Sequence, residues 1–473
     1  MASSWRFNLT SSPPRSSAGA ELLVHLDRSS SESLSRQIQQ ELRRSIQRGA
    51  LPAGARLPST RMLAADLGIS RPVVVDAYDQ LAAEGYLHTR PGTRPVVAEV
   101  AGLPDATTRT PPARETPILH DLRPATPSLS MFPRRTWLRM LRQAMSEMPA
   151  SAFGYDGRHG THELRQALAD YLGRVRGVVA EPQRIIVTSG FAEARALACA
   201  AFISLGVRRL AVEDPSYSSW ESVDRSGLVR VPVAVDADGM AVGKLDARKV
   251  RAVMVTPAHQ FPVGVVLSKA RRRQLVEWLE ARDALAFEDD YDAEFRYDQQ
   301  PIGALQGLAP ERVLYAGTVS KTLAPALRLG WLVVPGRIVD VVKAEQRRWN
   351  EGCPRIDQNA LAAFIASGHY DRHLRLMRRV YRTRRDALME AIGEFLPQAH
   401  PRGIAAGLHV TLCLPEAIDE AAVCAAVARR GVAIEAMGKY RLSGKGPPAL
   451  LLGYGGASER SLREAVRIIA AAM

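Results

Sequence analysis

The chain has 473 residues, which suggests roughly two to four domains rather than one. With 46% hydrophobic and 24% charged residues, it has the composition of a soluble globular protein. No apolar run approaches the ~18 residues of a membrane span. The segment from Met1 to Ala20 lacks the apolar core of a secretory signal. These features argue against a membrane or secreted protein and predict a cytoplasmic one.

The formal net charge is +14, and it comes almost wholly from arginine because the chain holds only seven lysines. Codon usage explains such a bias as well as a polyanionic partner does, so the charge alone leaves both explanations open. The four cysteines lie far apart without a Cys-x-x-Cys pair: Cys199, Cys353, Cys413 and Cys424. This spacing predicts reduced, mostly buried thiols rather than disulfides or a zinc site, and we expect no metal.

Changes in composition divide the chain into four segments. Residues 1–27 are predicted to form a mobile leader, and residues 28–98 a compact, mainly helical domain. Residues 99–118 are rich in Pro, Thr and Ala without helical periodicity, which is typical of a linker. In residues 119–473, short β-branched runs alternate with helical stretches, which predicts an α/β domain with a mainly parallel sheet.

The helical domain contains three predicted helices and a hairpin. Leu34, Ile38, Leu42 and Ile46 are spaced four apart, so they share one face of a first helix. Ser59 and Thr60 can cap a second helix over 61–67, which Gly68 ends. A third helix opens at Ser70-Arg71-Pro72, with its buried stripe at Val74, Tyr78 and Leu81. The run 85–94 then reads as a short β-hairpin, or wing.

Two short helices joined by a glycine turn are typical of a helix-turn-helix unit. The second helix of such a unit enters the major groove, where side chains near its N-terminus meet base edges. Ser70 and Arg71 stand at that end, Arg61 starts the preceding helix, and Arg90 and Arg94 lie on the wing. Arginine suits this surface because its planar fork binds guanine edges and phosphates. A three-helix cap with solvated arginines would show the same periodicity.

The motifs G-A-L-P-A-G-A-R-L-P-S-T-R-M-L-A and L-G-I-S-R-P-V-V bear on these alternatives. They resemble the GntR-type winged-helix DNA-binding domain, and the resemblance spans nearly the whole segment. It implies that Arg61, Ser70 and Arg71 contact double-stranded DNA. Pro91 stands where the family commonly has a glycine at the wing tip, so Arg90 and Arg94 are weaker candidates.

In the α/β domain, polar groups follow several apolar strands. Lys321 comes just after the strand that ends in Thr318, with Ser320 between them, and Arg328 is a lone charge in an apolar run. Asp289 and Tyr291 end another strand. Ser189 and Gly190 end a third, and Tyr217 follows a fourth. The carboxyl ends of parallel strands are where α/β proteins bind ligands, so we expect these groups to lie together.

These groups match the chemical demands of pyridoxal phosphate (PLP). PLP needs an amine for its aldehyde, a carboxylate for its pyridine nitrogen, a donor for its ring hydroxyl, and hydroxyls, amides and an arginine for its phosphate. An acid cluster at the end of a strand can equally serve as a helix cap. Four strand ends that carry the required groups favour the cofactor.

The motifs T-P-A-H-Q-F-P-V-G, E-D-D-Y-D-A-E-F-R-Y and Y-A-G-T-V-S-K-T-L-A-P-A-L-R-L-G-W resemble those of fold-type I aminotransferases, from about residue 120 onward. With the winged helix in front, the chain resembles the MocR-type subfamily of GntR regulators. The resemblance implies that Lys321 is the Schiff-base lysine, that Asp289 pairs with the pyridine nitrogen, that Tyr291 meets the ring hydroxyl and that Tyr217 stacks on the ring.

The resemblance also assigns residues to the phosphate and to a dimer. Arg328, Ser320 and the Ser189-Gly190 turn would hold the phosphate, with Thr318 beside them. Tyr155 matches a tyrosine that reaches the phosphate of a neighbouring subunit, which implies a homodimer.

Two departures bear on function. Phe261 precedes Pro262 where aminotransferases commonly have an asparagine, so one polar contact to the ring hydroxyl is missing. Ser218, Ser219, Trp220 and Glu221 stand where some amino-acid-sensing relatives carry an arginine, and Arg441 is the remaining candidate for an effector carboxylate. We therefore expect a transcription regulator that senses PLP or an amine or amino-acid adduct of it. The alternatives are an aminotransferase with an appended DNA-binding domain, and a regulator that has lost its cofactor.

Overall fold

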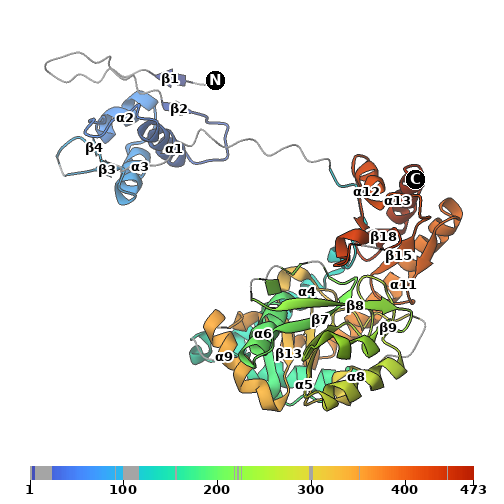
Figure 1. The fold of residues 1–473 in the computed structure, drawn as a ribbon. Coiled ribbons are helices and arrows are strands. Elements are labelled where there is room, and N and C mark those ends of the chain that lie inside the picture. The colour runs from blue at the N-terminus through green and yellow to red at the C-terminus, as the bar shows by residue number, and fades with distance from the viewer. Residues whose placement is uncertain are drawn as a thin grey trace. The chain divides into compact units, whose positions relative to one another are not determined.

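The computed structural model describes residues 3–5, 24–90, 92–99, 117–154, 157–217, 219–220, 223–224, 226–297, 302–350, 352–444 and 446–473. The chain forms two compact units, Met1–Arg114 and Glu115–Met473, each of which is described by itself (Figure 1). Most of the predicted leader and linker falls outside the described residues. The described parts of residues 1–27 include β1 (Ser3–Trp5) and β2 (Val24–Leu26), which pair antiparallel.

The first unit contains three helices and a short hairpin: α1 (Leu34–Gln47), α2 (Thr60–Leu67), α3 (Arg71–Ala83), β3 (Leu87–His88) and β4 (Val96–Val97). Ser59 caps α2 by accepting from the Met62 amide, and Gly68 ends this helix in the left-handed conformation. The predicted stripe of α3 is buried in the core of this unit. Ile38 and Leu42 are fully buried, whereas Leu34 and Ile46 pack at the edge of the same core.

The second unit is built on an eight-stranded sheet in the order β6-β13-β12-β11-β10-β7-β8-β9. The strands are β6 (Ile185–Thr188), β7 (Arg209–Asp214), β8 (Val229–Asp236), β9 (Gly239–Met240), β10 (Ala252–Val255), β11 (Leu285–Asp290), β12 (Val313–Thr318) and β13 (Gly330–Val333). β13 runs antiparallel to both of its neighbours, while β12, β11, β10, β7 and β8 are mutually parallel. The carboxyl ends of β6, β7, β10, β11 and β12 therefore meet at one edge.

Helices cover both faces of this sheet because successive side chains on its strands point to opposite sides. On β12, Leu314 packs toward α6 (Phe191–Ser204) and α9 (Val339–Trp349), and Tyr315 packs toward α5 (His162–Arg176) and α10 (Arg355–Ala366). Val313 joins a further cluster beneath α8 (Lys269–Ala281). Figure 1 shows the strands between these helices. The arrangement confirms the predicted aminotransferase-like α/β fold.

A smaller antiparallel sheet, in the order β14-β15-β18-β17, follows at the C-terminal end. Its strands are β14 (His400–Arg402), β15 (His409–Cys413), β17 (Glu435–Ala436) and β18 (Ala449–Gly453). The 27-residue helix α11 (His369–Phe395) leads into this sheet and packs on α13 (Glu459–Ala470). The remaining elements are β5 (His120–Asp121), which pairs with β16 (Val432–Ala433), α4 (Arg134–Glu147) and α12 (Glu420–Ala428).

No helix in the described part of the chain is long and apolar enough to cross a membrane. The four cysteines are free thiols, of which Cys199 and Cys353 are buried and Cys413 and Cys424 are half-buried.

Candidate functional site

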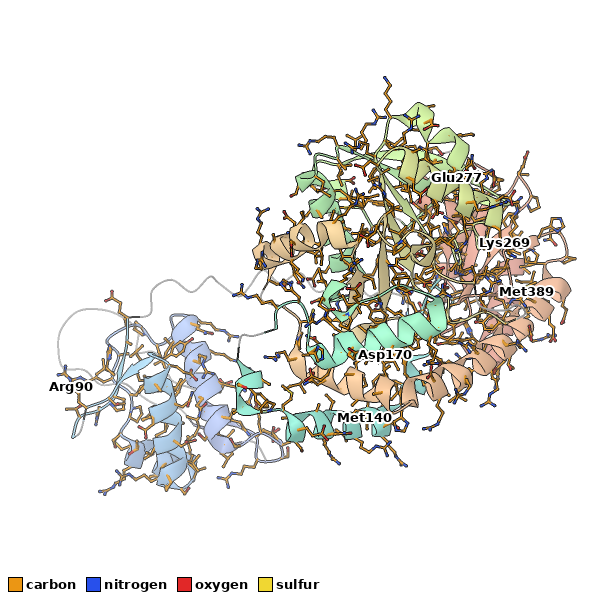
Figure 2. All side chains as sticks on the ribbon, turned by 90° about the horizontal axis from the view of Figure 1, so that it is seen from below. Arg90, Met140, Asp170, Lys269, Glu277 and Met389 are labelled. Carbon is orange, nitrogen blue, oxygen red and sulfur yellow. The ribbon has the colours of Figure 1, made fainter. Side chains whose placement is uncertain are left out.

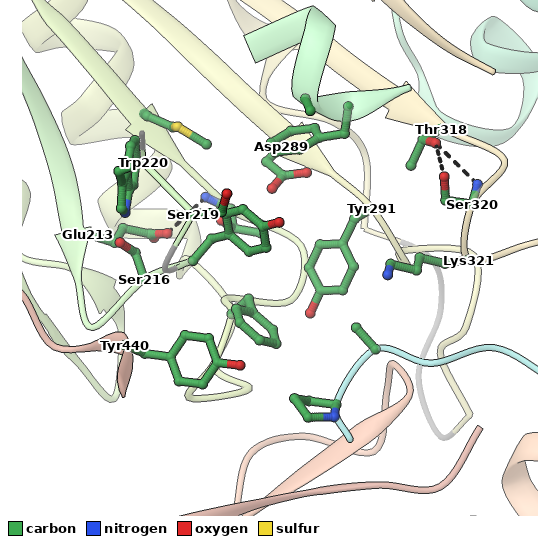
Figure 3. A pocket seen from close by; sticks show the side chains of 18 of the residues that line it. Glu213, Ser216, Ser219, Trp220, Asp289, Tyr291, Thr318, Ser320, Lys321 and Tyr440 are labelled. Carbon is green, nitrogen blue, oxygen red and sulfur yellow. Dashed lines mark hydrogen bonds between the residues drawn. The ribbon is translucent and has the colours of Figure 1, made fainter. Parts of the chain in front are cut away.

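The aligned strand ends line a cavity of about 500 Å³ in the second unit. Its walls include seven of the residues that the sequence predicted as cofactor contacts: Tyr217, Asp289, Tyr291, Thr318, Ser320, Lys321 and Arg328. Figure 3 shows the Lys321 side chain directed toward Tyr291, with Asp289 on the neighbouring wall. The topology thus brings together groups that lie more than 100 positions apart in the sequence.

The turn after β12 positions Lys321. The Thr318 hydroxyl donates to the Leu329 carbonyl at 3.1 Å and accepts from the Ser320 amide at 3.1 Å, which holds the turn against β13. Burial lowers the pKa of Lys321, although the carboxylates of Asp292 and Asp289 oppose this shift. A lowered pKa leaves more of the amine neutral at physiological pH, and the neutral amine is the form that attacks an aldehyde.

Asp289 and Asp290 at the end of β11 have different surroundings. Asp290 accepts from Arg176 Nε at 2.8 Å and from the Tyr315 hydroxyl at 2.7 Å, inside the core. Asp289 faces the cavity, and its buried Oδ1 has no hydrogen-bond partner among the described residues. Burial, followed by the charge of Asp290, raises the pKa of Asp289 well above its ordinary value. A protonated ring nitrogen in the cavity would supply the missing partner, so this carboxylate fits PLP.

Tyr291 is supported by two residues that sequence reasoning missed. Its hydroxyl lies 3.1 Å from Nδ1 of His259, and the same nitrogen lies 2.9 Å from Oδ2 of Asp292. All three side chains are buried. His259 and Asp292 both stand in the aminotransferase-like motifs, but their contact joins loops after different strands. Only the packing of β10 beside β11 brings them together.

Gly190 precedes α6 and approaches Arg328, which lines the cavity. Gly190 has φ +92°, and a Cβ at this position would lie 3.6 Å from the Arg328 guanidinium carbon. Open amides at a helix N-terminus beside an arginine form a cradle suited to a phosphate. Ser189 is arranged differently, because its amide donates to Glu193 at 2.6 Å and its hydroxyl lies 3.4 Å from Cys353 Sγ. Ser189 and Gly190 adjoin the cavity without lining it, so their phosphate role stays a prediction.

The outer wall of the cavity is largely aromatic. The Phe261 ring lies 6.0 Å from Tyr291, 5.1 Å from Tyr440 and 6.4 Å from Tyr217, between centroids. Phe261 therefore fills with hydrocarbon the place where an asparagine would present a polar group. Burial raises the pKa of Glu213, at the end of β7, to about 7.

Three further lining residues come from β17 and the short 3-10 helix Met437–Tyr440 that follows it, and they were not predicted: Glu435, Lys439 and Tyr440. Lys439 Nζ lies 2.8 Å from Glu435 Oε1, and the Tyr440 hydroxyl donates to Glu435. No sequence motif marks these residues, because only the return of the C-terminal sheet toward the strand ends makes them part of the wall.

Two other predicted residues are not found among the lining residues, for different reasons. Tyr155 lies outside the described residues, so its predicted contact stays a prediction. Arg441 is absent from the lining, and its guanidinium donates to the Pro447 carbonyl and approaches Glu420 to 3.9 Å. The Arg441 guanidinium is thus bound to neighbouring groups of the chain and does not face the cavity in which an effector would bind.

In the first unit, the five predicted DNA contacts are all exposed: Arg61, Ser70, Arg71, Arg90 and Arg94. Arg71 Nε donates to the Thr60 hydroxyl at 3.3 Å, which places the start of α3 beside the start of α2. Arg94 Nη2 lies 3.9 Å from Met62 Sδ, which brings the wing to the same helix start. Ser70 makes no side-chain cap to its own helix, so its hydroxyl remains available. The two helix starts and the wing thus meet at one place.

Comparison with known proteins agrees with both units. Residues 34–97 match the family "Bacterial regulatory proteins, gntR family", and residues 133–469 match "Aminotransferase class I and II". The chain is 34% identical over 456 residues to the HTH-type pyridoxine biosynthesis transcriptional regulator PdxR of Corynebacterium glutamicum, covering 94% of this chain and 97% of that protein. It is 32% identical over 472 residues to the probable rhizopine catabolism regulatory protein MocR of Rhizobium meliloti, covering 95% and 96%.

Among solved structures, kynurenine aminotransferase from Pyrococcus horikoshii in complex with PMP is similar, with a TM-score of 0.69 and 25% identity. The likeness covers 76% of this chain and 91% of that one. The relatives that span nearly the full length carry both units in the same order, and the fold of each unit agrees with its family. The chain therefore belongs to the MocR-type subfamily of GntR transcription regulators, in which a DNA-binding winged helix precedes an aminotransferase-like domain.

Proposed function

We propose that this regulator holds PLP on Lys321 and that occupancy of the cavity changes its affinity for promoter DNA. The observation that carries the proposal is the unpartnered buried carboxylate of Asp289 in the same cavity as the half-buried amine of Lys321. When bound, PLP supplies an electrophilic aldehyde and a ring that stabilises negative charge. Asp289 would hold the ring nitrogen protonated, and Arg328 with the amides of α6 would hold the phosphate.

Three further residues would orient the ring. Tyr291, held by His259, would donate to the ring hydroxyl, and Tyr217 would cover one face of the ring. Phe261 supplies no polar contact beside that hydroxyl. A catalyst must stabilise and protonate a carbanion at every turnover, whereas a sensor needs only to bind its ligand and change shape. The apolar residue at 261 therefore favours sensing over efficient transamination.

The effector in this proposal is PLP itself or an amine or amino acid that combines with it. One relative of nearly full length is named as a regulator of pyridoxine biosynthesis, which supports PLP as the first ligand to test. We propose a homodimer as the functional unit, because the resemblance places Tyr155 at a neighbouring subunit's phosphate. A ligand can shift such a dimer only through different affinities for its two states.

The test uses one preparation of the full chain in two assays. The first measures keto-acid formation from a panel of amines with an acceptor keto acid. The second measures binding to the protein's own promoter with and without PLP and each amine. We expect promoter affinity to change with ligand while multiple turnover stays at background. Rapid turnover, together with promoter affinity that ignores every ligand, would contradict the proposal and favour an aminotransferase.

A further inference from the structure

The first unit does not account for the positive charge of the chain. Residues 1–114 carry 14 Lys and Arg against 10 Asp and Glu, a net charge of +4, and residues 115–473 carry the other +10. Within the second unit, the first 17 residues of α11, residues 369–385, hold seven arginines and one acidic residue. A dense block of arginine on one helix calls for an explanation beyond uniform codon usage.

Six of the seven arginines fall into two groups, and the seventh, Arg385, pairs with Asp386 at 3.4 Å. Arg378 and Arg384 turn inward, where they donate to the carbonyls of Glu294 and Gly455. Four others are exposed, and no described carboxylate lies within ion-pair distance of any of them: Arg372, Arg375, Arg379 and Arg382. Their spacing of three, four and three residues puts them on one face of the helix, along about 15 Å of its axis. The exposed group therefore serves neither an internal ion pair nor a backbone carbonyl.

The row continues onto α4 through His369. Arg139 Nη2 lies 2.9 Å from Nε2 of His369, and Arg372 Nη1 lies 2.8 Å from Nδ1 of the same ring. Desolvation and these two guanidiniums hold the pKa of His369 below its ordinary value. Figure 2 shows α4, marked by Met140, and α11 along the same side of this unit. Positive groups that have no described carboxylate within ion-pair distance repel one another, and a bound anion relieves that repulsion.

We propose that this arginine row, formed by Arg139, Arg372, Arg375, Arg379 and Arg382, binds the phosphate backbone of DNA that flanks the winged-helix site. Arginine forks bind phosphate oxygens in bidentate fashion. Duplex DNA carries about one charge per 1.7 Å of axis, so a row about 15 Å long faces several phosphates in any sequence. The row would thus add affinity without adding sequence preference.

The covalent link to the winged helix favours DNA over other polyanions. Seventeen residues separate Glu99 from Pro117, and a chain of this length reaches at most about 60 Å. Once the winged helix is bound, this tether gives the second unit an effective DNA concentration in about the millimolar range. None of the five residues of the row lines the described cavity, so the row can bind phosphates whether or not PLP is the effector.

The experiment compares two promoter fragments, one limited to the winged-helix footprint and one extended by about 30 base pairs of unrelated sequence. The test variant is R375A/R379A/R382A in the full chain. Alanine suits these exposed helical positions, and no described side chain loses an ion-pair partner. The matched control is R209A/R248A/R273A, which removes three exposed arginines from other elements, and none of the three has an ion-pair partner among the described residues. Arg273 lies on α8, whose labelled Glu277 is far from Met140 in Figure 2.

On the long fragment we plot the logarithm of the binding constant against the logarithm of the salt concentration. We expect the slope of this plot to be about 2.7 less steep for the test variant than for wild type, if one arginine row engages DNA. Between 50 and 200 mM salt, wild type should therefore lose about 40-fold more affinity than the test variant. On the short fragment the two proteins should bind alike, and the control should follow wild type on both.

Equal slopes for the test and control variants on the long fragment would overturn the proposal. If the test variant lost the same affinity on both fragments, the proposal would be overturned too, since the row would then act within the winged-helix footprint or on folding. A test variant that sediments as a different oligomer from wild type would reassign the row to a contact between copies. Each of these outcomes is compatible with PLP-dependent promoter binding, so failure here is distinguishable from failure of the proposed function.

Discussion

Asp289 and Asp290 are consecutive carboxylates on β11 that face opposite sides of the sheet, one unpartnered in the cavity and one paired with Arg176. The pleat of the strand separates them, because alternate side chains point to opposite faces. Burial costs a charged group several kcal/mol unless it is paired, so only Asp290 is compensated within the chain. The same substitution at the two positions should therefore have opposite effects on stability.

Asp289→Asn should stabilise the cofactor-free protein by about 1–3 kcal/mol at about pH 7.5, because folding then no longer requires this residue either to bury an unpartnered charge or to take up a proton. The raised pKa of Asp289 means that the folded state keeps a proton which the unfolded state has released. Wild-type stability therefore falls as pH rises from the ordinary carboxyl range to the raised value. The gain should shrink toward about pH 4, near the ordinary Asp pKa, and disappear below it, where Asp289 is protonated in both states. Urea unfolding of the variant and of wild type at both pH values, without PLP, measures this difference in the free energy of unfolding.

The same Asp289→Asn variant should retain PLP less tightly, by about 10–100-fold, because a charged hydrogen bond to the ring nitrogen is replaced by a neutral one. Equilibrium titration with PLP, followed by visible absorbance, gives the affinity. A variant that binds PLP as tightly as wild type would show that Asp289 does not meet the ring nitrogen.

Asp290→Asn should destabilise the protein by about 3–5 kcal/mol, because Arg176 is then left as a buried charge without its carboxylate. The loss should appear with and without PLP, since Asp290 faces the core. Urea unfolding of this variant beside Asp289→Asn provides the comparison. If both substitutions changed the free energy of unfolding of the cofactor-free protein in the same direction, the assignment of the two side chains to opposite faces would be contradicted.

Lys321→Ala should abolish the visible absorbance of the PLP-loaded protein and the fixation of PLP by borohydride. Lys439→Ala is the matched control, because Lys439 is the other lysine in the described lining of the cavity. Mass spectrometry after reduction locates the modified residue. A borohydride-stable PLP adduct on Lys321→Ala would place the attachment on another lysine.

Arg71→Ala should weaken binding to the promoter by about 1–3 kcal/mol and relax base preference if Arg71 reads a base edge. If it contacts a phosphate instead, the salt slope should fall by about one without a change in preference. Arg48→Ala is the control, since Arg48 is exposed at the far end of α1 and no ion pair of it is seen among the described residues. Binding of Arg71→Ala that matches Arg48→Ala at equal salt would exclude the proposed docking of α3.

The sequence was sufficient to predict elements that depend on local signals. The Ser59 cap, the Gly68 stop and the Val74–Leu81 stripe define the helix-turn-helix through neighbours in the chain. The gathering of Lys321, Asp289 and Tyr291 was also predictable, because parallel strands place their carboxyl ends at one edge.

The remaining parts of the site depend on contacts between distant elements. His259 supports Tyr291 only because β10 lies beside β11, and Glu435 reaches the cavity only because the C-terminal sheet folds back on it. The Glu-Asp-Asp run illustrates the same limit. These residue types are also compatible with a helix cap, and only the strand register shows that the Asp290 side chain enters the core while that of Asp289 faces the cavity.

Helix α11 is tied to the residue after Lys321. The Tyr370 hydroxyl donates to the Thr322 hydroxyl at 2.8 Å, and His373 Nε2 lies 3.0 Å from the Thr322 carbonyl, with all three residues buried. A displacement of the backbone at Lys321 must therefore carry the first turn of α11 with it or break two buried hydrogen bonds. Because the exposed arginines begin at Arg372, between Tyr370 and His373, such a displacement would also move the start of the arginine row. The lysine that we propose as the PLP attachment site is thus joined through Thr322 to the helix that carries the exposed arginines.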